Sequence, residues 1–469
     1  MPAAIASPPA SSPTAAPDAM AEQSGRLIAR LERLPIAGTL VWTRVVVGTA
    51  TFFDGYTTLA IAFVLPVLAR QWQLSPGQIG WIISSGYVGQ LLGALACSWL
   101  AERYGRLKVL TGTIVIYTAM SLLCIFSWNA GALMLFRFLQ GIGTGGEVPV
   151  ASAYINEFAS ASRRGRFFLL YEVLFVVGLA FAAVLGYLLV PSLGWRSLFY
   201  VGLLPAALTL QMRMLLPESP RWLLSKGRVA EAEAVVARLE ADAVARGRAL
   251  PAPGPVRAVA AAGARGGWAE LFSPVYRRRT LMVWTLWFAA YTVNNGLVTW
   301  LPTLYVKFFD VKLQTALGYG FVTNLFGVAT SILCALTIDR VGRRRWYIAA
   351  FLLAALPLLA LFGLGARSAV EVLVLATLAY GIVQTITFSL YLYTAELYPT
   401  RIRALGSGAG SAWLRIGSSV GPLLVAQMVA GFGVTSVFAA FAAILAGGGA
   451  VCAGFAIETR LRVLEELSP

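Results

Sequence analysis

Five ionisable side chains lie within long apolar segments of the sequence, where a charge has its largest chemical effect. Asp54 lies within the run TFFDGYTTLAIAF, and Arg137 and Glu147 share a second apolar segment. Glu172 and Arg415 lie in two others. A charged side chain at the centre of a bilayer costs about 2.5–3.5 kcal/mol on insertion scales, so such residues usually pair with each other or face a polar path. We therefore expect them to handle protons, ions or a charged substrate.

Asp54 is the residue best placed for proton exchange. With a rise of about 1.5 Å per helical residue, it lies about 14 Å from the inner end of its segment; Arg137 is about 6–7 Å away in depth and Arg415 is level with it. A neighbouring cation favours the ionised carboxylate, whereas burial favours the neutral acid. A carboxylate that alternates between these conditions releases and takes up a proton, so we predict proton coupling at Asp54 and Arg137. A structural ion pair without coupling is the alternative.

The sequence lacks the residues for several other kinds of chemistry. It contains no histidine, which excludes imidazole proton relays and histidine-ligated metals. Its four cysteines lie in apolar segments without a CxxC spacing, so we expect them to be buried core residues. The polar loops contain no nucleophile–base pair, and the chain has no cofactor motif. We therefore predict that the protein is not an enzyme and uses neither a metal nor a cofactor.

The charges must be positioned by membrane-spanning helices. Hydrophobic residues make up 58% of the 469-residue chain and charged residues 12%, whereas soluble proteins contain about 25% charged residues. A helix of about 20 apolar residues crosses the hydrocarbon core of a bilayer. We predict an all-α polytopic membrane protein with twelve transmembrane helices in two pseudo-symmetric six-helix bundles. The expected spans are 45–69, 78–101, 108–127, 131–157, 166–190, 195–216, 280–304, 315–338, 346–364, 370–396, 404–428 and 432–457.

The distribution of lysine and arginine predicts the orientation. With the N-terminus in the cytoplasm, 30 of the 37 basic residues lie in or beside cytoplasmic segments and five lie outside, as the positive-inside rule requires. Both termini are therefore expected in the cytoplasm. The same belt of charge accounts for the net charge of +16 without nucleic-acid binding.

Polar segments divide the chain into five regions. Residues 1–40 are expected to form a disordered cytoplasmic tail, because their start is rich in Ala, Pro and Ser and has no secretory signal. Residues 41–216 and 280–458 hold the two bundles, and a cytoplasmic linker with one helix lies between them at 217–279. Residues 459–469 are expected to form a short cytoplasmic tail.

A repeat relates the two halves. AERYGRLK follows the second predicted span and IDRVGRRR follows the eighth, with equivalent residues 237 positions apart. An acid and an arginine seven residues apart follow the fourth and the tenth spans. Similar halves around a central path are typical of secondary transporters, and we predict that ion pairs at these loops latch one access state; topological charge alone is the alternative. The predicted gating residues are Glu102, Arg103, Gly105, Arg106, Glu157, Arg164, Asp339, Arg340, Gly342, Arg343, Glu396 and Arg403.

At these loops the chain resembles the major facilitator superfamily. RFLQGIGTGGE in the fourth span is also similar to a motif of that superfamily, and we expect its glycines to serve helix packing. PESPRWL and ELYPTRIRALG resemble the branch that holds sugar porters, metabolite–proton symporters and organic-ion carriers. The resemblance covers about residues 40–460 and implies a multi-pass transporter of the bacterial inner membrane that works by alternating access.

Within that branch, the chain departs from the sugar porters. It lacks their glutamines on spans 5 and 7, and Tyr391 and Thr57 align with a tryptophan and an aspartate of those carriers. FFDGYTTLAIAFVLPVL and GGEVPVASAYINEF look more like metabolite–proton symporters and niacin-type carriers. In this resemblance Arg137 matches the coupling arginine directly, whereas Asp54 lies one helical turn from the family's acid.

The resemblance also implies a class of substrate. In related organic-ion carriers the residue seven before the proline of span 11 tends to be Arg in anion carriers, and Arg415 lies seven before Pro422. A guanidinium binds a carboxylate through two parallel hydrogen bonds, and aromatic faces suit a planar acid. The candidate substrate-binding residues are Arg415, Tyr56, Thr57, Glu147, Glu172, Tyr291, Asn294, Asn295, Trp300 and Tyr391.

Together these features predict a carrier that imports a small organic anion, such as an aromatic or nicotinate-like carboxylate, with protons. Its expected partners are the substrate, protons and the lipid bilayer, and we expect a monomer. A sugar carrier, an organic-cation carrier or a facilitator without coupling remain open alternatives. A membrane sensor built like a transporter is a more remote one.

Overall fold

The computed structural model describes residues 15–35, 38–158, 164–253 and 268–459. These residues form helices and no strand. The helices are α1 (Ala15–Glu32), α2 (Thr39–Gln71), α3 (Pro76–Tyr104), α4 (Arg106–Ile125), α5 (Ala130–Phe158), α6 (Arg164–Leu193), α7 (Arg196–Val201), α8 (Ala206–Leu215), α9 (Pro220–Ser225), α10 (Val229–Ala245), α11 (Trp268–Leu271), α12 (Arg277–Phe308), α13 (Leu313–Val341), α14 (Arg343–Leu364), α15 (Ala369–Leu397), α16 (Thr400–Phe432) and α17 (Val434–Phe455).

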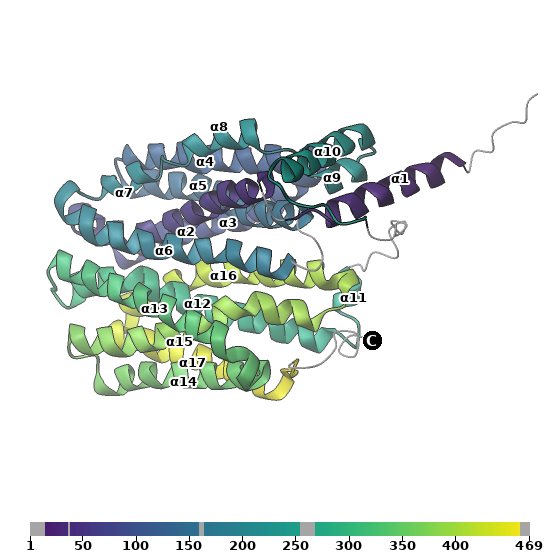
Figure 1. The fold of residues 1–469 in the computed structure, drawn as a ribbon. Coiled ribbons are helices and arrows are strands. Elements are labelled where there is room, and N and C mark those ends of the chain that lie inside the picture. The colour runs from purple at the N-terminus through teal and green to yellow at the C-terminus, as the bar shows by residue number, and fades with distance from the viewer. Residues whose placement is uncertain (1–14, 36–37, 159–163, 254–267, 460–469) are drawn as a thin grey trace, which may run out of the picture.

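The long helices are grouped into two bundles. Figure 1 shows α2 to α8 in one layer and α12 to α17 in the other, with α6 and α16 along the boundary between them. Helices α1, α9 and α10 lie at one end of the molecule, which we call the linker end. This arrangement confirms the predicted all-α fold of two six-helix bundles.

Twelve helical segments have the positions expected for membrane spans. Nine helices of the described chain are long and apolar enough to cross a membrane by composition alone. Helices α5 and α12 bring the number to eleven; they are less apolar, because they carry charged, amide and glycine residues in their middle. The sixth span is broken into α7 and α8 by a turn between Val201 and Ala206. These two polar spans hold part of the candidate site: Arg137 and Glu147 lie on α5, and Tyr291, Asn294, Asn295 and Trp300 lie on α12.

Glycines set the spacing of the first bundle. A Cβ at Gly89 of α3 would lie 2.0 Å from the carbonyl oxygen of Phe138 on α5, and one at Gly141 would lie 2.1 Å from that of Gly86. No side chain fits at either place, so α3 and α5 pack backbone to backbone. The packing role predicted for the glycine motif of the fourth span is confirmed.

The linker end differs from the prediction in one respect. Part of the tail that we expected to be disordered forms α1, so that part of the prediction is wrong. Leu27 and Leu31 of α1 are buried against residues of α9 and α10, and Arg30 and Arg33 form ion pairs with Glu240 at 2.7 and 2.6 Å. Burial of the apolar face and these ion pairs give the segment the tertiary contacts that stabilise a short helix.

Candidate functional site

Two buried carboxylates lie inside the first bundle. Asp54 on α2 and Glu147 on α5 are 3% and 0% exposed. The Thr51 hydroxyl donates to Oε1 of Glu147 at 2.8 Å, and the Tyr117 hydroxyl lies within electrostatic range of both acids. Because Thr51 is one turn from Asp54 on the same helix face, the structure brings these two acids into one polar cluster.

Arg137 on α5 is also buried but has neutral partners. Its Nη1 donates to the carbonyl oxygen of Thr57 at 3.2 Å and to Oε1 of Gln140 at 2.6 Å. In the described part of the chain it forms no ion pair with Asp54, so the direct pair that we considered is absent from this structure. Arg137 is level with Thr57, one turn along α2 from Asp54, and the Tyr87 hydroxyl lies within electrostatic range of both charges.

Arg415 on α16 lies at the boundary of the two bundles. Its Nη1 donates to the carbonyl oxygen and the hydroxyl of Ser411 at 3.0 and 3.3 Å. Its Nη2 donates to the carbonyl oxygen of Gly145, on α5 of the other bundle, at 3.3 Å. It is 5% exposed and lies within electrostatic range of Asp54. The guanidinium therefore bridges the two bundles through neutral oxygen atoms.

An aromatic cluster lies beside Arg415. Tyr291 stacks on Trp287 with ring centres 5.5 Å apart, and Tyr391 meets Trp287 edge to face at 4.6 Å. Arg415 is within electrostatic range of both tyrosines. Trp287 was missing from the prediction, although its position one turn before Tyr291 places it on the same helix face.

The predicted amides form a polar layer in the second bundle. Asn294 donates to Oε1 of Gln384 at 2.8 Å, and Asn295 donates to the Ser418 hydroxyl at 2.7 Å. The Tyr87 hydroxyl, from α3 of the first bundle, donates to Oδ1 of Asn295 at 3.2 Å. Gln384 and Tyr87 were not predicted, because a side chain's partner on a distant helix leaves no local signal in the sequence.

Four other predicted residues lie apart from this layer or have side chains outside the described residues. Tyr56 is fully buried and donates its hydroxyl to the carbonyl oxygen of Leu198 at 2.7 Å, which places it inside the first bundle. Trp300 is fully buried in the hydrophobic core. Glu172 lies in α6, and its side chain is outside the described residues. Thr57 contributes its carbonyl oxygen to Arg137, as described above.

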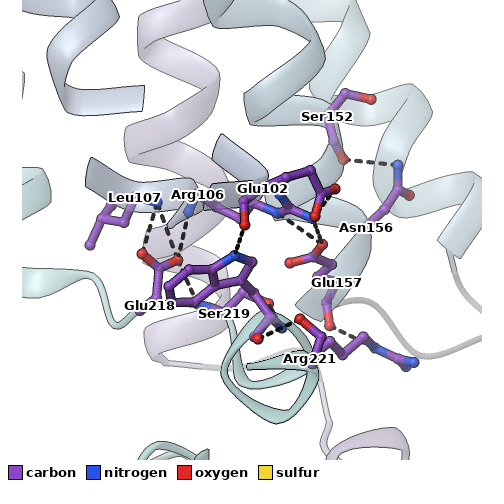
Figure 2. A network of polar contacts seen from close by, with 11 residues as sticks. Glu102, Arg106, Leu107, Ser152, Asn156, Glu157, Glu218, Ser219 and Arg221 are labelled. Carbon is purple, nitrogen blue, oxygen red and sulfur yellow. Dashed lines mark hydrogen bonds and ion pairs between the residues drawn. The ribbon is translucent and has the colours of Figure 1, made fainter. Parts of the chain in front are cut away.

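The first charged loop forms a network at the linker end, shown in Figure 2. Arg106 forms ion pairs with Glu102 at 2.7 Å and with Glu157 at 3.1 Å. Glu218 accepts hydrogen bonds from the backbone N–H groups of Arg106 at 3.1 Å and Leu107 at 3.2 Å. It thereby caps the first turn of α4, where anions are favoured. Burial raises the pKa of the Glu218 carboxyl, against the opposing effect of its backbone hydrogen bonds.

The second charged loop repeats this geometry. Arg343 forms ion pairs with Asp339 at 2.6 Å and with Glu396 at 3.0 Å. Glu458 accepts from the backbone N–H groups of Arg343 at 2.9 Å and Arg344 at 3.2 Å. Glu458 thus matches Glu218 of the first network, and neither residue was among the predicted gating residues.

The remaining gating residues have different surroundings. Gly105 and Gly342 have φ angles of +114° and +93°, a backbone that favours glycine. Arg340 is exposed, and Arg103 lies 5.6 Å from the ring centre of Trp99. Of Arg164 and Arg403, only the backbone is described; their side chains lie outside the described residues.

Known proteins share this architecture. A family model described as "Sugar (and other) transporter" matches residues 43–469. The chain belongs to this family of the major facilitator superfamily. The niacin transporter NiaP of Acinetobacter baylyi is 34% identical over 452 residues, which cover 94% of this chain and 99% of the relative. The 4-hydroxybenzoate transporter PcaK of the same species is 31% identical, covering 80% and 82% of the two chains.

A solved structure supports the same fold. The xylose transporter XylE from E. coli, in an inward open conformation, has a TM-score of 0.69 and 18% sequence identity, and the match covers 91% of this chain and 99% of that one. The family match and the two relatives above show that the protein is a multi-pass membrane transporter of a small molecule rather than an enzyme, as predicted.

The two bundles of this transporter touch at the end opposite the linker end. Arg70 donates to the carbonyl oxygen of Val306 at 3.2 Å, and Lys307 donates to that of Leu74 at 2.6 Å. Nearer the middle, the Ser84 hydroxyl donates to the carbonyl oxygen of Ser419 at 2.7 Å. The cross-bundle hydrogen bonds found among the described residues thus lie between the middle and this end, whereas both charged networks lie within single bundles.

Proposed function

We propose that this transporter carries a small organic anion, of the size and shape of nicotinate or a hydroxybenzoate, together with protons. The observation that carries the proposal is the position of Arg415. It is a buried guanidinium at the bundle boundary whose described hydrogen bonds all go to neutral oxygens. A carboxylate is the natural partner of such a group because it accepts two charge-assisted hydrogen bonds.

The surroundings of Arg415 suit a planar substrate. Tyr291, Tyr391 and Trp287 present aromatic rings beside the guanidinium. Aromatic faces bind planar rings by stacking or edge-to-face contact, and a few convergent polar groups fix the orientation of a ligand. NiaP and PcaK, which are named for niacin and 4-hydroxybenzoate, support a substrate with one ring and one carboxylate.

Asp54 is the proposed proton carrier. It is buried and lies within electrostatic range of Arg415. The positive charge of Arg415 favours the ionised form of Asp54, and a substrate carboxylate bound to Arg415 offsets that charge. Binding of the anion therefore favours protonation of Asp54, and protonation of Asp54 favours binding of the anion.

The charged networks are the proposed gates. Each lies at the linker end, and each ties the loop after α3 or α13 to an acid at the end of α5 or α15. We propose that the linker end faces the cytoplasm of an inner membrane and that these networks rearrange when the bundles rock. A relative from E. coli named as an inner membrane metabolite transport protein, 29% identical over 416 residues, supports this location.

Uptake into proteoliposomes tests the proposed function. The purified protein is reconstituted, and radiolabelled nicotinate, 4-hydroxybenzoate, nicotinamide and xylose are supplied with and without an inward proton gradient. We expect gradient-driven accumulation of the two acids above that in protein-free liposomes, which corrects for passive diffusion. Preferential uptake of xylose or nicotinamide would contradict the anion assignment, and uptake of the acids without response to the gradient would contradict the coupling.

A further inference from the structure

The positive charge of Arg137 is not neutralised by any acid that forms an ion pair with it in the described part of the chain. Arg137 is 6% exposed, and its Nε has no hydrogen-bond partner among the described residues. In the described part of the chain, no carboxylate forms an ion pair with it; its two partners are the Thr57 carbonyl and the Gln140 amide. A buried cation without a counter-charge is strongly unfavourable, so such a group calls for an anion.

A small cavity lies against this guanidinium. It is far smaller than an ordinary ligand pocket, and it is lined by Thr57, Thr58, Gly86, Gln90, Arg137, Gln140, Gly141 and Thr144. The lining holds one cation, hydroxyls and amides, and no acid. Its three helices, α2, α3 and α5, all belong to the first bundle.

Hydrogen bonds within the lining orient two of its hydroxyl groups. Gln90 donates to the hydroxyl oxygens of Thr58 and Thr144 at 3.3 and 3.4 Å. These bonds occupy acceptor sites on both hydroxyls and leave the Thr58 proton available for a guest. Gly86 keeps the wall beside Arg137 open, because a Cβ there would lie 3.0 Å from Nη2.

We propose that this cavity binds one small monovalent anion, of the size of chloride or formate, on Arg137. The space is smaller than the about 300–1,000 Å³ typical of ligand pockets, so it suits an ion rather than an aromatic acid. The anion would neutralise Arg137 inside one bundle, independently of the substrate proposed for Arg415. The site is thus a structural counter-ion site that stays within the first bundle when the bundles move.

Thermal unfolding of the full-length transporter in detergent tests the site. Sodium chloride is exchanged for sodium gluconate at constant ionic strength, since gluconate is too large for the cavity. We expect chloride to raise the Tm by at least about 2 °C in a saturable way, because a ligand that binds only the folded state stabilises it. An unchanged Tm in the wild-type protein would overturn the proposal.

Two variants assign the effect to the cavity. Gln140→Glu puts a carboxylate where an oxygen already accepts from Arg137, and Arg137→Gln removes the charge; both should lose the chloride effect. Arg415→Gln, at the other buried arginine, is the matched control and should keep it. A chloride effect that persists in both cavity variants, or that is lost in Arg415→Gln alone, would place the anion elsewhere and refute the assignment.

A second measurement needs no variant. Chloride-35 NMR of the wild-type protein should show excess line broadening that formate displaces and nicotinate does not. If there is no excess broadening, the cavity does not bind chloride. If nicotinate displaces chloride competitively, the cavity accepts the substrate's carboxylate, and the separate anion site is wrong.

Discussion

The two buried arginines of this transporter both donate hydrogen bonds to neutral oxygen atoms, but they do so in different parts of the molecule. Arg137 contacts only its own bundle, through Thr57 and Gln140. Arg415 contacts its own helix at Ser411 and the other bundle at Gly145. When two bundles rock as rigid bodies, contacts within a bundle persist and contacts across the boundary change.

This difference separates two roles that the sequence alone does not distinguish. A charge held within one bundle keeps a constant environment, so its counter-ion can stay in place. A charge at the boundary gains and loses partners during the cycle, so it can bind a carboxylate in one state and release it in another. We therefore place the substrate at Arg415 and a resident anion at Arg137.

The largest expected effect is at the boundary. Arg415→Ala should weaken binding of nicotinate by about hundredfold, since truncating one partner of a buried charge pair costs about 2–5 kcal/mol. Arg415→Lys should recover part of this loss, because a lysine keeps the charge but not the planar fork. Isothermal titration of the purified variants measures both. If Arg415→Ala weakens nicotinate binding by less than about threefold, the substrate carboxylate does not bind at this residue.

The next effect tests the rigidity of the first bundle. Gly89→Ala should destabilise the folded protein by about 1–3 kcal/mol through overpacking, because its Cβ would meet the carbonyl oxygen of Phe138. Gly112→Ala is the matched control: a Cβ there meets nothing within 4 Å. Thermal unfolding compares the two. Equal stability of both variants would mean that α3 and α5 can move apart at little cost. The surroundings of Arg137, on α5, would then not be rigid.

Loss of proton coupling should lower the accumulation of substrate by about one order of magnitude. With one proton per substrate, a gradient of one pH unit supports about tenfold accumulation, since one unit is worth about 1.4 kcal/mol. Asp54→Asn should reduce accumulation to that of an uncoupled carrier while exchange of labelled for unlabelled substrate continues. If this variant still accumulates substrate in response to the gradient, Asp54 is not the proton carrier.

The smallest effect is expected at the linker end, away from both arginines. Glu240→Gln should destabilise the protein by about 1 kcal/mol or less, because ion pairs near the surface are worth little. Burial opposes ionisation of Glu240, but its bonds to Arg30 and Arg33 outweigh it and lower its pKa.

The lowered pKa of Glu240 determines how its contribution to stability depends on pH. A carboxyl group whose pKa is lower in the folded state than in the unfolded state stabilises the folded protein at pH values above its unfolded-state pKa. This stabilisation is lost as the pH falls through its folded-state pKa. The difference between Glu240→Gln and wild type should therefore be present at pH 7 and vanish in acid. Glu231→Gln, which breaks the more exposed pair with Arg228, is the control and should leave the Tm unchanged. A pH-independent difference would show that Glu240 acts through packing rather than charge.

The sequence was most informative where chemistry is local. Asp54 and Arg415 stand out as charges in apolar segments, and the repeat of the charged loops predicts two similar halves. The partner of Arg137 could not be read in this way, because it depends on the rotation of α5 relative to α2, and depth alone does not define that rotation. Glu458 was missed because it lies near the end of the chain, far in sequence from the helix it caps. Helix α1 was missed because its stability comes from contacts with α10.

The most direct test of the boundary site compares nicotinate with nicotinamide, which has the same ring and size but no charge. Wild-type protein, Arg415→Gln and Arg137→Gln are titrated with both ligands. We predict that the wild-type protein prefers nicotinate strongly, that Arg137→Gln keeps this preference, and that Arg415→Gln loses it. Equal preference in wild type and Arg415→Gln, or a preference lost only in Arg137→Gln, would contradict the placement of the substrate carboxylate at the bundle boundary.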